Sequence, residues 1–541
     1  MSKAVGYALF VLFVSCCTLM PFRGVSDWPI VGRWISAAFG VWLLLLWWTA
    51  ACLVAARGDS AGRTAVNIIA AWRPMSWAML SCNVALVAYG LLQCAGLFAS
   101  AGPFAVTAGF DNPAGLASAL AVTFPFASVP WREGGDSRTA CRLPVPLTFL
   151  LLLFVADAFV LYVAGSRAGI IALATGLAAL RPLSSCGRRV RVAVAAILSP
   201  ALMAALVLMF ARKGASTSGR SLILRCSWDL FVQHPLTGHG FGGFRRCYMS
   251  HQASWLAQPG NGSLSQLADN VNHPLCEYMA VLVNHGVAGL AILLTALALT
   301  LRHALRHPTA AGRVPLAVIS AIAVMSLFSY PFRYPLTLAA LAFSVMGIYS
   351  DSAVRVGRRA AGFLTASAAL AATLAAVLLL YPWLKAQMEW KRVLDRTDTE
   401  HVTVDVLSAY DRLEPELRRD PYFQYSRALV LLCAGHVEEA KQAAEASLSR
   451  LDNYDTWLLA GDIERSLGNV RVADSIYVHA GAMCPSRFMP LYRRFTLYQD
   501  TGDAERIREV GGEILSKPMK VNSAEVRRMR LAVRQTMAGM M

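Results

Sequence analysis

The segment 212–278 concentrates basic and titratable side chains in a chain that is otherwise apolar. A planar guanidinium binds two oxygens of a phosphate in a fixed fork, so several arginines on one loop favour a phosphate or pyrophosphate ligand. A solvated loop that contacts lipid headgroups is the alternative for these arginines alone. The side chains concerned are Arg212, Lys213, Arg220, Arg225, Arg245 and Arg246, with His234, His239, His251 and His273.

A polar stripe follows this loop. The order Asn272-His273-Pro274 predicts a helix start, because proline suits the first helical position. His273, Glu277 and Asn284 then lie four and seven residues apart, on one face of an apolar helix. A histidine beside a carboxylate at a membrane boundary can take a proton from a hydroxyl at neutral pH. A histidine that only caps the helix is the alternative.

The elements that position these residues are membrane helices. The chain has 541 residues, of which 56% are hydrophobic and 15% charged, whereas soluble domains carry about a quarter charged residues. This composition excludes collagen-like, disordered and small disulfide-rich classes. We expect an all-α bundle of about eleven spans within residues 1–382. The apolar windows are 4–21, 36–56, 75–98, 114–130, 146–164, 168–181, 191–211, 279–301, 314–331, 335–350 and 361–381.

The basic excess is largely topological. The net charge is +17, and arginines collect in alternate connections of the bundle, which predicts a cytoplasmic N-terminus. The first window lacks a convincing cleavage site and is interpreted as a retained span. With eleven spans, the loop 212–278 and everything after residue 382 of this multi-pass protein are expected outside the cytoplasm.

The segment 383–541 changes to mixed charged and apolar residues with helical spacing. Gly435, Gly468 and Gly502 are 33 and 34 residues apart, each beside a turn signal. Tyr425, Trp457 and Tyr492 precede the turns at similar offsets. This period resembles about three tetratricopeptide repeats, which pack on their own neighbours and serve as docking surfaces. We therefore expect an independent repeat domain whose deletion leaves the loop intact, with His401, His436 and His479 solvated on its surface.

Several motifs occur in the order found in the O-antigen ligase and polymerase family. The segments that resemble that family are Gly109-Phe110-Asp111-Asn112-Pro113, Gly165-Ser166-Arg167-Ala168-Gly169, Ser218-Gly219-Arg220, Trp228-Asp229, His234-Pro235-Leu236-Thr237-Gly238-His239-Gly240, Asn272-His273-Pro274-Leu275-Cys276-Glu277-Tyr278 and Gly286-Val287-Ala288-Gly289-Leu290. They cover roughly residues 100–350. One departure concerns His273: many members have asparagine after the histidine, where this chain has Pro274, and the following glycines lie two residues farther away. Keeping the register of the glycines would put Leu275 at the histidine position.

The resemblance implies transfer of a glycan from a polyprenyl-diphosphate carrier to an acceptor hydroxyl, by a glycosyltransferase that needs no metal and no cofactor. It implies that Arg167 and Arg220, with Arg225 nearby, hold the diphosphate. His273 corresponds to the base, and Glu277 is expected either to orient it or to hold the sugar. The acceptor is a glycan, lipid or protein, the repeat tail offers a site for a protein partner, and nucleic acid is not a partner.

Three alternatives remain open at this stage. A polysaccharide polymerase has the same motifs as a ligase and differs in its acceptor. A flippase or transporter of lipid-linked glycans also needs many spans, although its charges are expected at the bundle midplane rather than at one face. A membrane-tethered repeat scaffold does not require the polar stripe. In the outer loop, a disulfide between Cys226 and Cys247 is a further hypothesis.

Overall fold

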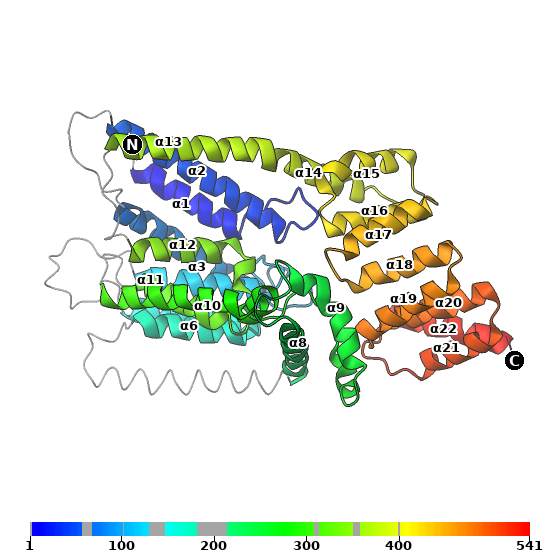
Figure 1. Cartoon of the computed structure of the whole chain (residues 1–541). Helices are drawn as coiled ribbons and strands as arrows, with labels where there is room; N and C mark the ends of the chain where they lie inside the picture. Colours follow the sequence, from blue (N-terminus) through cyan, green and yellow to red (C-terminus); the bar gives the residue numbers. More distant parts are fainter. Residues whose placement is uncertain are drawn as a thin grey trace. The chain divides into compact units, whose positions relative to one another are not determined.

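The computed structural model describes residues 3–56, 68–100, 102–128, 147–180, 214–307, 313–349, 358–398 and 401–540. Throughout these ranges the regular structure is helical, with no strand. The chain divides into two compact units (Figure 1). Unit 1 contains residues 1–213 and 292–384, and unit 2 contains residues 214–291 and 385–541.

Unit 1 is built from short and long apolar helices. They are α1 (Lys3–Thr18), α2 (Val31–Ala56), α3 (Ile68–Cys94), α4 (Pro113–Thr123), η1 (Phe124–Ser128), α5 (Leu147–Val163), α6 (Arg167–Leu180), α11 (Val314–Met325), η3 (Pro331–Arg333), α12 (Pro335–Ile348), α13 (Arg358–Ala375) and the π-helical turn η5 (Ala376–Leu380). The end of α10 (Glu277–Arg306) also belongs to it.

In the described part of the chain, four helices are long and apolar enough to cross a membrane: Val31–Ala50, Pro74–Cys94, Glu277–Arg306 and Phe363–Leu394. Six shorter apolar helices coincide with other expected windows. The window 191–211 lies outside the described residues. The membrane character and the all-helical class are therefore confirmed, while the number of spans stays a prediction.

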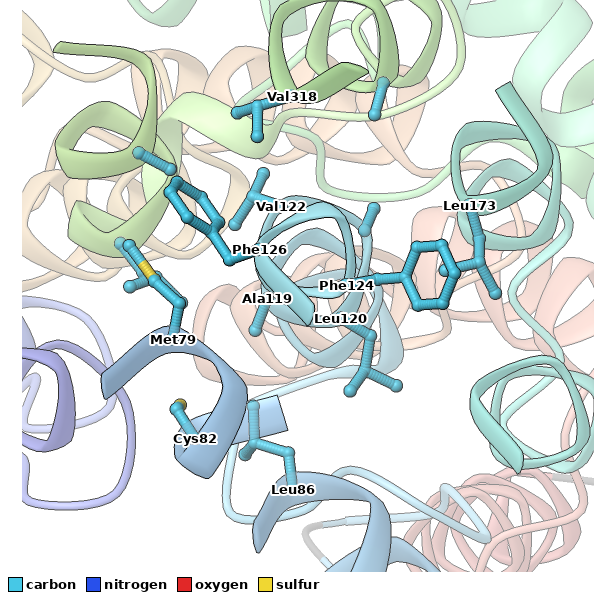
Figure 2. Packing of buried hydrophobic residues seen from close by; sticks show 14 of the residues in the cluster. Met79, Cys82, Leu86, Ala119, Leu120, Val122, Phe124, Phe126, Leu173 and Val318 are labelled. Atoms are coloured by element: carbon cyan, nitrogen blue, oxygen red, sulfur yellow. The ribbon is translucent and has the colours of Figure 1, made fainter. Parts of the chain in front are cut away.

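Helix α4 lies at the centre of unit 1. It packs against α3, α5, α6, α11 and α12, and every residue from Gly115 to Thr123 is buried. Figure 2 shows Leu120 and Phe124 directed between the neighbouring helices, near Leu173 of α6. A helix buried on all sides needs no polar face, which explains its mainly apolar sequence, and the hydroxyls of Ser118 and Thr123 donate to the helix's own carbonyls.

Unit 2 combines the expected outer loop with the expected tail. Its helices are α8 (Gly214–Gln233), α9 (Gly243–Leu256), η2 (Gly262–Leu267), the first half of α10, α14 (Tyr381–Leu394), α15 (Val404–Leu417), α16 (Pro421–Cys433), α17 (Val437–Leu448), α18 (Tyr454–Ser466), α19 (Val470–Met483), α20 (Met489–Thr501), α21 (Ala504–Ser516) and α22 (Ala524–Gly539). From α15 onward, each helix packs on the next.

The glycine period of the tail has a structural cause. Gly435, Gly468 and Gly502 follow α16, α18 and α20, with φ of 83°, 79° and 69°. This left-handed conformation is easiest for glycine, and it ends one helix so that the next can pack back against it. The turns predicted from the sequence are therefore present, and the helices form consecutive pairs.

The tail packs against the loop. Tyr454, Ala480, Met483 and Cys484 of the tail share one buried cluster with residues of α8, α9 and the start of α10. The loop residues of this cluster include Leu222, Cys226, Leu230, Phe244, Tyr248, Met249 and Val283. The loop and the tail thus share a common core, and the expectation that the tail folds independently stays a prediction.

Candidate functional site

The expected catalytic pair lies where α10 begins. The helix starts at Glu277, not at His273-Pro274, so His273 belongs to the preceding loop. Leu275 has a φ of 57°, and this left-handed residue interrupts the predicted helix start. His273 Nε2 nevertheless lies 3.7 Å from Glu277 Oε2, and their side chains are 25% and 13% exposed. The two residues are brought together, although not by the helical spacing that predicted it.

The second nitrogen of His273 is also occupied. Its Nδ1 accepts a hydrogen bond from the Leu275 backbone N–H at 3.0 Å. A neutral imidazole that accepts through Nδ1 carries its proton on Nε2. That proton is on the nitrogen nearest Glu277, which lies 3.7 Å from the carboxylate, so the ring turns an N–H rather than a lone pair toward Glu277.

Helix α10 is broken at Gly286, which has φ 64° and ψ −165°. The segment 235–240 packs into this break and supplies the missing hydrogen bonds. The N–H groups of His239 and Gly240 donate to the carbonyls of Val283 and Asn284, at 2.8 and 2.9 Å. In return, the N–H groups of residues 287 and 288 donate to the carbonyls of residues 235 and 236. A break in an apolar helix is tolerated when the freed backbone groups find partners, as those of residues 283, 284, 287 and 288 do here.

Glycines are required on both sides of the break. A Cβ at Gly286 would lie 2.3 Å from the Leu236 carbonyl carbon, and a Cβ at Gly238 would lie 2.5 Å from the Asn284 carbonyl carbon. The His-Pro-Leu-Thr-Gly-His-Gly motif is thus explained by backbone packing against α10. Asn284 also has a structural role, because its Oδ1 accepts from the Phe244 N–H at 2.9 Å near the start of α9.

Arg220 and Arg225 lie on α8, and both are exposed. The opposite face of α8 is buried through Leu222, Cys226 and Leu230, so packing fixes the helix while leaving these guanidinium groups accessible. α8 packs against α9 and η2, within the unit that contains His273 and Glu277.

Other loop arginines have structural partners. The guanidinium of Arg246 donates to the His239 carbonyl at 2.8 Å, and Arg245 lies over the Tyr422 ring at 6.0 Å. Cys226 and Cys247 are both free thiols, so the disulfide hypothesis is not met. Burial raises the pKa of the Cys226 thiol to about 12. Arg212 and Lys213 lie outside the described residues.

Arg167 belongs to unit 1 and is the first residue of α6. The Gly-Ser-Arg-Ala-Gly motif builds this helix start. Gly165 has a φ of 71°, and Ser166 Oγ accepts from the Gly169 N–H at 3.3 Å. A Cβ at Gly169 would lie 2.7 Å from the Ala117 Cβ, so that glycine permits close packing on α4. The motif therefore presents Arg167 at a fixed helix end.

Polar contacts join the loop that precedes α10 to the tail. Arg487 Nη2 donates to Asp269 Oδ1 at 2.7 Å, four residues before His273. Asp452 is only 5% exposed and accepts from Ser250 Oγ at 3.0 Å and from Trp457 Nε1 at 2.8 Å. The Asp269–Arg487 and Ser250–Asp452 contacts could not be predicted from local sequence patterns, because their partners are about 200 residues apart.

His479 corrects one prediction. It was expected to be solvated, but its Nε2 lies 3.1 Å from Ser250 Oγ and its ring packs on Trp457 at 4.7 Å. Burial lowers the pKa of His479 below its ordinary value of 6.5. His401 and His436 are exposed, as expected.

A cavity of about 540 Å³ lies within unit 2. Its walls come from α16, α18, α20 and α22, and Asp269 of the loop that precedes α10 also lines it. Asp455 and Asp462 line it too, and burial raises the pKa of both carboxyls. Among the described residues, no group of three His, Cys, Asp or Glu side chains is arranged to hold a metal ion.

Apolar helices of spanning length and an all-helical fold define an integral membrane protein. Within that class, residues 150–294 match the family model described as O-antigen ligase. Residues 150–294 are therefore similar to an O-antigen ligase domain, and the resemblance indicated by the motifs is confirmed over this segment. This domain supports glycan transfer from a lipid-linked donor in the inner membrane, as part of polysaccharide biosynthesis. No curated protein and no solved structure matches the chain.

Proposed function

We propose that this protein transfers a glycan from a polyprenyl-diphosphate carrier to an acceptor hydroxyl on the outer face of the inner membrane. The observation that carries the proposal is the His273–Glu277 pair, which lies inside the O-antigen ligase match at the start of an apolar helix of spanning length. A titratable pair at such a boundary is accessible to a lipid-linked donor and a water-soluble acceptor.

The reaction is one displacement at the anomeric carbon. The acceptor oxygen forms the new glycosidic bond, and the bond from the anomeric carbon to the diphosphate oxygen breaks. The electron pair of that bond leaves with the carrier diphosphate, and the proton of the acceptor hydroxyl passes to a protein base. A single displacement inverts the anomeric configuration.

Glu277 is the base in this proposal, and His273 positions it. The His273 lone pair at Nδ1 is engaged by the Leu275 N–H, while the carboxylate is an acceptor in its ionised form. With its proton on Nε2, His273 faces Glu277 and orients the carboxylate. This reverses the roles expected from the family resemblance while keeping both residues.

The arginines stabilise the departing diphosphate. Exposed guanidinium groups at Arg220 and Arg225 suit two phosphate oxygens each and need no metal to offset the developing charge. The same role is proposed for Arg167, on the basis of its place in the Gly-Ser-Arg-Ala-Gly motif. Fixed cations of this kind act on the charge that grows as the carrier leaves, which is where catalysis gains most.

The proposed topology has about eleven spans, a cytoplasmic N-terminus and an extracytoplasmic unit 2. The tail is proposed to be tetratricopeptide-like, on the basis of its helix pairs and its three glycine turns. The cavity between its helices supports a docking role toward a protein partner or acceptor.

A reconstituted transfer assay tests this function. Proteoliposomes would receive a polyprenyl-diphosphate glycan together with either a lipid-core or protein acceptor, or with a second lipid-linked glycan. Glycan transfer to the lipid-core or protein acceptor identifies a ligase, and transfer to the second lipid-linked glycan identifies a polymerase. Arg220→Ala should lower transfer by about 10²-fold or more, whereas the exposed tail residue Arg471 offers a matched control, Arg471→Ala, with no loss. Wild-type transfer by Arg220→Ala and Arg167→Ala at normal abundance would contradict the assignment.

A further inference from the structure

Helix α8 has two apolar faces. One is buried in unit 2 through Leu222, Cys226 and Leu230. Three large apolar residues on the other side, Leu224, Trp228 and Val232, are 37%, 54% and 54% exposed. Their spacing of four residues aligns them along one side of the helix. Packing within the protein therefore accounts for one face and leaves the other unexplained.

The exposed apolar surface continues beyond the end of α8. Leu236 is 74% exposed and Phe241 is 91% exposed, both in the connection between α8 and α9. Contiguous exposed apolar groups of this size mark a surface that another phase or molecule covers. We call Leu224, Trp228, Val232, Leu236 and Phe241 the apolar stripe.

The position of the apolar stripe indicates what covers it. The Leu236 carbonyl accepts from the Ala288 N–H, and the neighbouring Pro235 carbonyl accepts from the Val287 N–H at 2.8 Å. These contacts fix the connection directly on α10, a helix long and apolar enough to cross a membrane. Val287 is itself 48% exposed at this point. The stripe is thus continuous with the surface of a candidate span.

The charges beside the stripe favour an anionic surface. Arg220 and Arg225 lie on the same helix and are exposed. The one acidic side chain of α8, Asp229, lies 3.0 Å from His251 Nε2, which offsets its charge when the ring is protonated. Tryptophan next to arginine is typical of the headgroup region of a bilayer, where the aromatic ring is half-buried and the cation meets phosphate.

We propose that α8 and the following connection form an interfacial element whose apolar stripe inserts into the lipid leaflet, with anionic phospholipid as the occupant. The insertion holds Arg220 and Arg225 at the depth of lipid phosphates. It concerns the membrane lipids themselves and involves the two arginines that are also proposed to hold the carrier diphosphate, but lipid cross-linking tests it without any measurement of transfer.

Photo-crosslinking of the full-length protein tests this surface. p-Benzoylphenylalanine would replace Trp228 or Phe241 in separate variants, which keeps an aromatic ring at each exposed position. The protein would be placed in nanodiscs of radiolabelled phosphatidylglycerol and phosphatidylcholine. Leu299, 57% exposed on α10, provides a positive control, and Leu531, 56% exposed on α22, provides a negative control.

We expect lipid adducts at Trp228, Phe241 and Leu299 and none at Leu531. Adducts at Trp228 and Phe241 should favour phosphatidylglycerol over phosphatidylcholine at least twofold, and Arg225→Ala should reduce that preference. Lipid adducts at Leu299 alone, or cross-links from Trp228 and Phe241 to the protein's own helices, would overturn the proposal. Equal labelling by both lipids would overturn its anionic component.

Discussion

The core of unit 1 and the core of unit 2 are each stabilised by a different kind of internal contact. The core of unit 1 is mainly apolar, with α4 packed on all sides by helices such as α3 and α6 (Figure 2). Its buried carboxyl, Asp157, accepts a hydrogen bond from Asn83 Nδ2, 74 residues away. The core of unit 2 joins segments about 200 residues apart, and a buried carboxylate, Asp452, bridges them. The contrast teaches that the segment with the catalytic pair depends on a distant part of the chain for its shape.

Removing the tail should produce the largest effect. Deletion of residues 390–541 exposes Leu222, Tyr248 and Met249, which are buried in the common core. We expect transfer to fall at least 100-fold, since a 1 Å displacement of a catalytic group costs about that much. Limited proteolysis should also cleave within 214–276. Deleting only residues 519–541 is the control, because Met529 and Val533 of α22 belong to a separate cluster. A tailless protein with normal activity and an intact loop would show that the two segments fold separately.

The second-largest effect is expected from a substitution at the break in α10. Gly286→Ala forces a left-handed residue and places a Cβ 2.3 Å from the Leu236 backbone. We expect at least about 1–3 kcal/mol of destabilisation from the backbone conformation alone, with further cost from the contact. Thermal unfolding in detergent would measure it. Gly219→Ala is the matched control, since nothing lies within 4 Å of its added Cβ. Equal stability of both variants would refute the close packing of residues 235–240 on α10.

Two carboxylates that join the loop to the tail should differ in how much they contribute to the free energy of unfolding. Asp452→Asn disturbs a buried acceptor of several hydrogen bonds and should cost about 1–3 kcal/mol. Asp269→Asn weakens an ion pair whose side chains are 56% and 40% exposed, so about 0.2–1 kcal/mol is expected. Denaturant unfolding followed by a tail-specific probe would compare them. The reverse order would mean that the exposed pair, not the buried one, holds the segments together.

The smallest effect concerns pH. Burial lowers the pKa of His479 in the folded state, so the unfolded chain binds a proton that the folded chain excludes. This residue therefore adds stability above its ordinary pKa of 6.5, and the contribution is lost as pH falls below that value. Unfolding midpoints at pH 7.5 and 5.5 should differ less in His479→Gln than in wild type. An unchanged difference would assign the pH dependence to other groups, such as His251, whose pKa is also lowered by burial.

Local patterns in the sequence were enough for the helical class, the membrane character and the turns at Gly435, Gly468 and Gly502. These features depend on hydropathy and on backbone conformation within a few residues. The pairing of His273 with Glu277 was also predicted, but the helix start was misplaced, because Leu275 adopts a left-handed conformation that proline alone did not indicate. The contacts of Asp269 and Asp452 could not be predicted, since each depends on a residue brought close only by folding.

The roles of Glu277 and His273 provide the most direct test of the proposed reaction. Transfer would be measured across pH in proteoliposomes for wild type, Glu277→Gln, His273→Ala and His273→Gln, with donor binding measured separately. We predict that Glu277→Gln loses about 10²–10⁴-fold in turnover while still binding the donor. His273→Ala should lose less, and His273→Gln should recover part of that loss because its amide can still donate to the carboxylate. Normal turnover in Glu277→Gln, with His273→Ala inactive and its acidic limb abolished, would contradict the account and return the base to His273.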